Sequence, residues 1–112
     1  MNIIEQAKNF YELIGMDMFK DISAYMAYGY VFKTPDSLLL GKAVDTNAEL
    51  HPAAQWNVKK PDAWYVHMAV GKVGVSEFIK CIPYPLPKVG WMRHLKNKPV
   101  KFYDFKRIIR RK

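Results

Sequence analysis

The apolar residues near the start of the chain recur at the spacing of a helix. They fall on one side of the helix, and charged and amide side chains occupy the other side. The pattern predicts an amphipathic helix over residues 3–14, and Asp17 can cap a short second helix that reaches about residue 25. The apolar positions of the first helix are Ile3, Ile4, Ala7, Phe10, Tyr11 and Ile14.

From residue 25 onward the pattern changes to that of β-strands. Two apolar runs flank a segment in which Asp36 follows Pro35. Proline presets the backbone angle of a turn and aspartate bonds back to its own chain, so this segment favours a tight turn. We expect an antiparallel hairpin with strands at 25–33 and 37–44, followed by a long loop over residues 45–62.

The clearest strand of the sequence spans residues 63–70, where the side chains alternate in character. His67 lies opposite the apolar face of this strand, so we expect it at the surface or in a pocket. The alternation predicts one face made of Trp64, Val66, Met68 and Val70 and another made of Tyr65, His67 and Ala69.

Glycines and prolines divide the following segment. Two glycines in 71–74 end the strand, and Ser76 can cap a short helix over 76–82 that Pro83 terminates. Three alternating prolines favour an extended connector over 83–87.

The last third of the chain reads as a hairpin and a tail. Strands are predicted at 89–95 and 100–106 around a turn at 96–99, and a basic tail follows at 106–112. We therefore expect a single α+β domain over residues 1–112. In this fold an N-terminal helix and a short middle helix pack on one face of a mainly antiparallel sheet of about five strands.

Composition places the chain among globular domains. Of its 112 residues, 50% are hydrophobic and 14% aromatic, which supplies a core and disfavours disorder. No run approaches the roughly 18 apolar residues of a membrane span, and the N-terminus lacks the features of a signal peptide. Cys81 is the one cysteine, so no internal disulfide can form. We expect a cytoplasmic protein without a membrane partner.

Charge is divided unevenly along the chain. Residues 1–56 contain four basic and seven acidic side chains, whereas residues 57–112 contain fourteen basic and three acidic ones. Such an asymmetry favours an anionic partner for one end of the molecule. The alternative is a solvated basic surface that serves solubility.

The segment from Lys88 to Lys112 is the strongest candidate for function. It has ten basic residues and one acidic residue, interleaved with aromatic side chains. Several cations are needed to displace the counterions of a phosphate backbone, and exposed rings can stack on unpaired bases. The alternative is that these rings belong to the core. The predicted nucleic-acid-binding residues are Arg93, Lys96, Lys98, Lys101, Lys106, Arg107, Arg110, Arg111 and Lys112, with Trp91 and Tyr103 as stacking groups.

Catalytic and metal-binding patterns are weak. His51, His67, His94 and Cys81 are scattered, so we expect no metal site and no cofactor. Cys81 has apolar neighbours, which favours a buried, unreactive thiol. Asp62 and Asp104 fit turn and strand-surface positions. We expect that the protein is not an enzyme.

One enzymatic interpretation remains open. The order of elements in 63–105 resembles the later half of acetyl-CoA-dependent N-acetyltransferases, which bind pyrophosphate on backbone amides through Arg/Gln-x-x-Gly-x-Gly/Ala. The matching stretch here runs from Gly71 to Ser76 and keeps the central Gly74. Its first position is glycine and its last is serine, which departs from the pattern of that family. The resemblance covers less than half of the chain.

Three functions follow as expectations. The first is a small accessory protein whose basic half binds a polyanion, with nucleic acid as the preferred partner. The second is a structural or assembly component, for example of a virion or complex, that uses its basic half on an acidic protein surface or on another copy. The third is a degenerate N-acetyltransferase-like protein.

Overall fold

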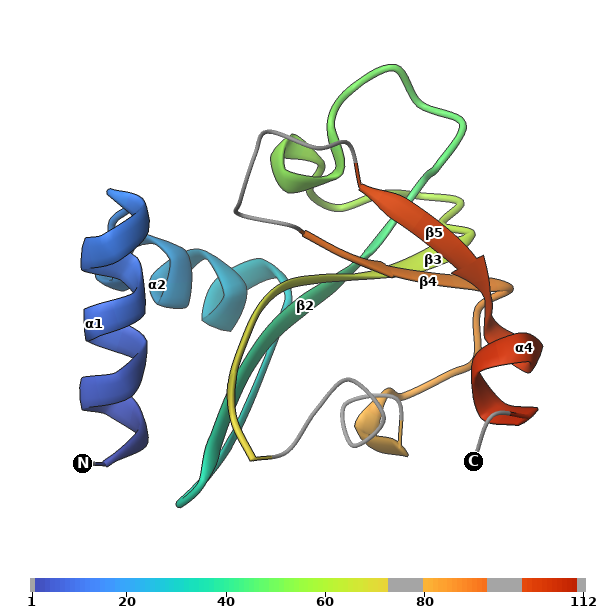
Figure 1. Ribbon diagram of the computed structural model, residues 1–112. Helices are drawn as coiled ribbons and strands as arrows, with labels where there is room; N and C mark the ends of the chain where they lie inside the picture. Colours follow the sequence, from blue (N-terminus) through green and yellow to red (C-terminus); the bar gives the residue numbers. More distant parts are fainter. Residues whose placement is uncertain (1, 73–79, 93–99, 111–112) are drawn as a thin grey trace.

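The computed structural model describes residues 2–72, 80–92 and 100–110, with side chains up to Arg107. Two N-terminal helices precede a five-stranded sheet, and the helix α4 follows the last strand (Figure 1). This arrangement confirms the α+β class. The elements are α1 (Ile3–Ile14), α2 (Met18–Tyr28), β1 (Tyr30–Thr34), β2 (Ser37–Val44), the 3-10 helix η1 (Pro52–Ala54), β3 (Ala63–Gly71), β4 (Lys88–Trp91), β5 (Lys101–Asp104) and α4 (Phe105–Arg110).

Side-chain caps fix the starts of both N-terminal helices. The side chain of Asn2 accepts a hydrogen bond from the backbone of Glu5 at 2.8 Å. The side chain of Asp17 accepts one from the backbone of Lys20 at 3.1 Å, as predicted. α2 continues to Tyr28, so the prediction of strand for residues 25–28 is wrong. Tyr25 is buried on the helix side that faces the sheet, and this packing overrides the strand preference of tyrosine.

The sheet has the strand order β1-β2-β3-β4-β5. All neighbouring strands are antiparallel except β3 and β4, which run parallel. The predicted hairpin of 25–33 and 37–44 is present, with its first strand shortened to β1. Parallel strands require a crossover connection, which here falls in residues 72–87.

The last strand is shorter than predicted. β5 ends at Asp104, whose carboxylate accepts a hydrogen bond from the backbone of Lys106 at 2.9 Å and caps the first turn of α4. Residues 105–110 are therefore helical, where strand and then tail were predicted. The turn at 96–99 and most of the helix at 76–82 lie outside the described residues, although Lys80 and Cys81 are helical.

A β-bulge changes the direction of side chains in β3. Leu40 pairs with Met68 and Gly41 pairs with Val66, so His67 is an extra residue in β3. Trp64 and Val66 pack in one core cluster, whereas Met68 packs in another. The prediction that these three residues share one face is wrong, because simple alternation does not survive an inserted residue.

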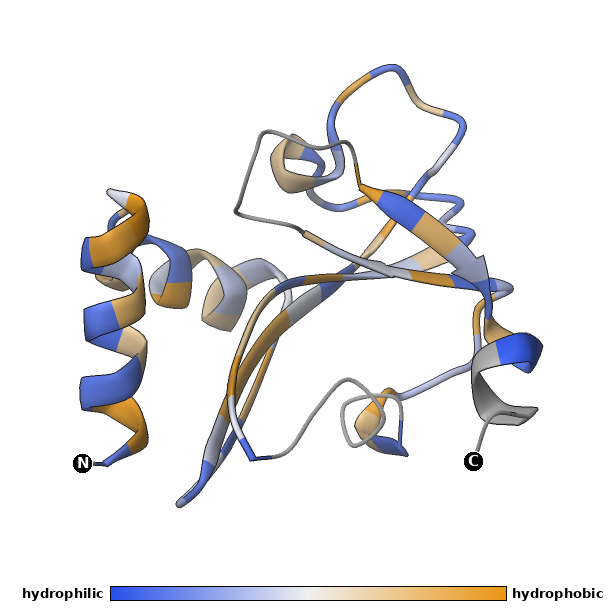
Figure 2. Cartoon of the chain, in the orientation of Figure 1, coloured by the Kyte–Doolittle hydropathy of each residue, from blue (hydrophilic) through white to orange (hydrophobic). Residues whose placement is uncertain are grey.

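Both faces of the sheet are covered, and the core is accordingly divided. On one face α1 and α2 pack over β2 and β3. Figure 2 shows that α1 carries both hydrophobic and hydrophilic residues, as an amphipathic helix does. On the other face the connector after Cys81 and the start of α4 pack over the strands. The buried residues of the first cluster are Ile3, Ala7, Tyr11, Met18, Tyr25, Leu38, Leu40 and Met68. Those of the second are Leu39, Trp64, Val66 and Val89.

The backbone at the end of β3 requires a glycine at position 71, and this requirement can be tested. Gly71 has a φ of 108°, and a Cβ atom there would overlap the carbonyl oxygen of Asp36 and lie 2.8 Å from Cα of Ser37. We expect Gly71→Ala to lower the free energy of unfolding by about 3 kcal/mol or more, measured by urea denaturation.

Gly15→Ala is the matched control. Gly15 has a φ of 71°, but no atom lies within 4 Å of a Cβ placed there. This substitution should cost only the left-handed strain, about 1 kcal/mol. Equal losses in the two variants would show that the clash with the β1–β2 turn is unimportant.

Candidate functional site

Buried polar side chains meet where α1, α2 and β3 come together. Oδ2 of Asp21 accepts a hydrogen bond from the hydroxyl of Tyr11 at 2.9 Å and lies 2.9 Å from Nε2 of His67. The other ring nitrogen, Nδ1, is 2.8 Å from the hydroxyl of Tyr65. Because a carboxylate only accepts, Nε2 donates to Asp21, and in the neutral ring Nδ1 accepts from Tyr65.

His67 is thus a buried residue, and the prediction of an exposed or pocket histidine is wrong. Only 4% of its surface is exposed, and the ring of Tyr25 stacks on it at a centroid distance of 5.3 Å. His67 does share a side of the strand with Tyr65, as alternation predicts. The helices α1 and α2 cover that side, and Met68, which follows the bulge, points to it as well.

Burial and the nearby carboxylate act on the phenols of this cluster. Burial, followed by the charge of Asp21, raises the pKa of Tyr11 and of Tyr65 above the ordinary value for tyrosine. Burial also raises the pKa of Tyr25, whose hydroxyl has no hydrogen-bond partner among the described residues. Hydrogen bonds run in series through Asp21, His67 and Tyr65, as they do in a proton relay. Because the series is largely buried, we assign it a structural role that links α1, α2 and β3.

Lys42 is a buried cation that sequence analysis missed. It is 2% exposed, and its Nζ donates to the carbonyl oxygen of Ala53 at 2.9 Å and lies 3.4 Å from the centroid of the Trp56 ring. Burial lowers the pKa of Lys42 to about 8, and the charge of Asp21 opposes this effect. A signal existed: Lys42 alternates with the apolar Leu40 and Val44, at an inward position of the predicted strand 37–44.

The loop over residues 45–62 is held against the sheet by buried polar contacts and covers a small hollow. The side chain of Gln55 accepts from the backbone of Asp45 at 2.8 Å and donates to the carbonyl of Leu50 at 2.9 Å. Between this loop and β5 lies a hollow of about 220 Å³, with Gln55, His51 and Phe102 among its lining residues.

The basic C-terminal residues can be placed in part. Lys101, Lys106 and Arg107 are exposed, and none of them forms an ion pair with another described residue. Trp91 and Tyr103 are half-buried, and their rings stack at a centroid distance of 5.4 Å and an angle of 23°. The backbones of Arg93, Lys96, Lys98, Arg111 and Lys112 and the side chain of Arg110 lie outside the described part of the chain.

One face of β4 and β5 brings several of these groups together. Lys101 pairs with Trp91 across the two strands, so both residues point to the same face as Tyr103. The ring of Phe105 packs on the core cluster that Trp91 also contacts, which starts α4 on this side of the sheet. We call the group formed by Trp91, Lys101 and Tyr103 on the strands, with Lys106 and Arg107 at the start of α4, the basic face.

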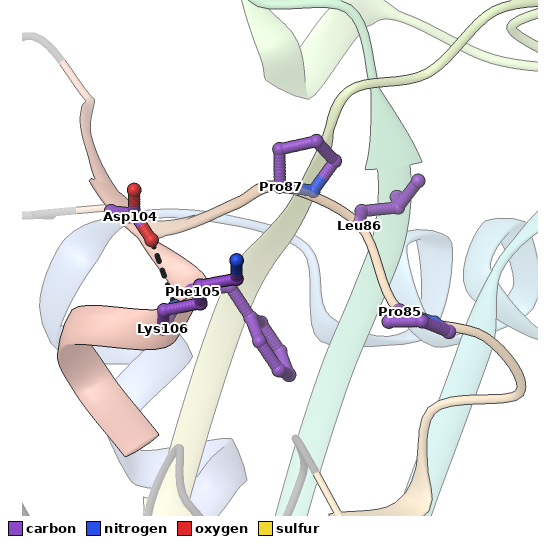
Figure 3. Close-up of a pocket in the computed structure, with 6 residues that line it drawn as sticks. All are labelled: Pro85, Leu86, Pro87, Asp104, Phe105 and Lys106. Carbon is purple, nitrogen blue, oxygen red and sulfur yellow. Dashed lines mark hydrogen bonds between the residues drawn. The ribbon is translucent and has the colours of Figure 1, made fainter. Parts of the chain in front are cut away.

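An apolar cleft adjoins the basic face. It has a volume of about 480 Å³ and lies between the proline connector and the start of α4 (Figure 3). The ring of Phe105 points toward the connector, and Asp104 and Lys106 close the other side (Figure 3). The lining residues are Pro85, Leu86, Pro87, Asp104, Phe105 and Lys106.

Other candidate chemistry is placed as follows. Cys81 is exposed, so the prediction of a buried thiol is wrong; the neighbouring Ile82 takes the inward position instead. Asp62 binds the backbone and hydroxyl of Thr46 in a turn, and Asp104 caps α4. Within the described ranges, no three His, Cys, Asp or Glu side chains are grouped as a metal site. None of the described helices is long and apolar enough to cross a membrane.

Comparison with known proteins adds no relative. No protein-family model matches the chain, and searches of curated proteins and of solved structures also find no match.

Lys42 gives a pH dependence that can be measured. The unfolded chain holds the Lys42 proton up to the ordinary value near 10.5, whereas the folded protein releases it at about 8. Between these values the unfolded state binds more protons, so the free energy of unfolding rises with pH by up to about 1.4 kcal/mol per pH unit. Above about pH 10 the buried tyrosines, whose pKa values are raised in the fold, reverse this trend.

The comparison variant is Lys42→Met, which keeps the length of the side chain. Urea denaturation from pH 7 to pH 10 should show the native protein gaining stability relative to this variant above pH 8. Parallel curves for the two proteins would contradict the assignment of a buried, charged Lys42.

Proposed function

We propose that the protein binds a polyanion, and specifically nucleic acid, through the basic face. The observation that carries this proposal is the placement of Lys101 beside the stacked Trp91 and Tyr103, with Lys106 and Arg107 on the adjacent helix. The cations of this face form no ion pair with another residue of the described ranges, which favours phosphate contacts.

The aromatic pair favours a single-stranded partner. Base edges and ring faces are accessible in unpaired strands, and stacking on a protein ring is worth about 1–3 kcal/mol per base. Both rings are half-buried: Trp91 packs on the core, Tyr103 stacks on Trp91, and part of each ring remains accessible. The ring positions are therefore set before binding, which reduces the entropy lost on association.

The charge-reversal variant Lys101→Glu, Lys106→Glu, Arg107→Glu tests the proposal. Removing three phosphate contacts should weaken binding at least tenfold and reduce the slope of log K against log salt by about 2–3. The measurement is fluorescence anisotropy of labelled single- and double-stranded DNA and RNA over a salt series.

A matched control exists in the N-terminal half. Lys8, Lys20 and Lys33 are exposed, and changing all three to glutamate alters the net charge by the same amount. This control should bind within about threefold of the native protein if the contact is local. Equal losses in both variants would indicate attraction by net charge alone. The absence of binding to any of the four nucleic acids at low salt would remove the proposal.

A second candidate is binding of an acetyl-CoA-type ligand, as the resemblance to N-acetyltransferases implies. The parallel pairing of β3 and β4 favours it, because ligands of parallel strands bind beyond their carboxyl ends, near the loop that leads into the crossover. Gly71, with its left-handed φ, begins that loop. The residues from 73 to 79 lie outside the described ranges.

Thermal unfolding with acetyl-CoA and CoA tests this candidate. A ligand at a hundred times its Kd stabilises the fold by about 2.7 kcal/mol, which raises the Tm of a domain of this size by roughly 10 °C. Pyrophosphate at the same concentration is the control for general anion binding. No rise in Tm, or an equal rise with pyrophosphate, would exclude a specific acetyl-CoA site.

A further inference from the structure

α2 carries an exposed apolar stripe that no described residue covers. Phe19 is 70% exposed and Met26 72%, and they are seven residues apart, on the same side of the helix. Ser23, between them, is also exposed. Met18 and Tyr25, each one residue before a stripe residue and so turned by roughly 100° around the helix, already pack in the core, and the stripe is a second apolar face.

The two helices at this end, together with the cap Asp17, carry four acidic and two basic side chains, so their charge is weakly negative. Leu13, near the end of α1, is 84% exposed and is a further apolar side chain close to the α1–α2 corner. The exposed carboxylates of Glu12 and Asp17 flank this corner, and Lys20 is the cation beside them. An apolar surface with an acidic border fits an apolar pocket with a basic border.

Such a pocket lies at the other end of the same chain. The cleft of about 480 Å³ is lined by the proline connector and Phe105, and the exposed Lys88, Lys106 and Arg107 lie in or beside its lining segments. α1 and α2 lie at one end of the molecule and α4 at the other (Figure 1), so the two surfaces of one copy face apart.

We propose that a second copy of this chain docks its α2 stripe, with Phe19 as the anchor, into the apolar cleft. Burial of an aromatic ring supplies the affinity, and the opposite charges of the two borders set the orientation. Because the contact joins two different surfaces, each copy keeps one of them free, and association continues head to tail as a chain or closes into a ring. This self-association does not require nucleic acid, although both proposals use Lys106.

Sedimentation velocity of the full chain, freed of nucleic acid, provides the test. The native protein should form species larger than a monomer at low salt, with a Kd that rises as salt is added. Phe19→Ser should raise the Kd for self-association at least tenfold. Leu50→Ser is the control, because Leu50 is 57% exposed but belongs neither to α2 nor to the lining of the cleft.

Mixing two variants tests the head-to-tail geometry. Lys106→Glu damages the border of the cleft and should also be monomeric, while its stripe stays intact. A mixture with Phe19→Ser, whose cleft is intact, should give a 1:1 dimer that grows no further. A monomeric native protein at all concentrations, a monomeric mixture, or self-association of Lys106→Glu through α2 alone would each overturn the proposal.

Nucleic-acid binding separates the two proposals. Phe19→Ser should bind nucleic acid as the native protein does, because Phe19 lies outside the basic face. Loss of self-association with retained binding supports the docking of α2 in the cleft. If Phe19→Ser lowered both by the same factor, association would be bridged by nucleic acid and the proposal would fail.

Discussion

The contact between His67 and the Asp21 carboxylate governs how the helices sit on the sheet. Removing a carboxylate from water is costly unless hydrogen bonds compensate, and the partly buried Asp21 accepts one from Tyr11 of α1 and one from His67 of β3. The bulge at His67 also turns Met68 to the same face. The hydrogen bonds of Asp21 and the apolar side chains that pack under α1 and α2 therefore lie side by side. Moving the bulge by one residue would separate them.

Local patterns predicted much of the fold. The helix at 3–14, the cap at Asp17, the strand at 37–44 and the α+β class are confirmed because each depends on spacing or on one capping side chain. The errors have non-local causes. Tyr25 is helical because it packs on the sheet, and His67 is buried because the face opposite Trp64 is covered as well. Neither the sheet that packs on Tyr25 nor the helices that cover His67 can be recognised from the neighbouring residues in the sequence.

The candidate site was predicted less well than the fold. A count of basic residues identified the C-terminal half, and Lys101, Lys106 and Arg107 are indeed exposed. The same count gave no special place to Lys42, one of the four basic residues of the first half, although it is a cation of the core that lies over the ring of Trp56. What distinguishes Lys42 is its position between Leu40 and Val44 on an inward face. Charge indicates function only after strand alternation has assigned each cation to a side.

Surface and interior thus use charge in opposite ways. Inside, Lys42 and Asp21 are fixed by rings and hydrogen bonds, so their charges hold elements together and are screened little by salt. Outside, the cations of the basic face have no described carboxylate partner, so salt weakens whatever they bind. Lys106 belongs both to that face and to the cleft, and a bound phosphate and a docked second copy would compete for it. One ammonium group thereby couples the two proposed activities and makes them mutually exclusive at that end of the molecule.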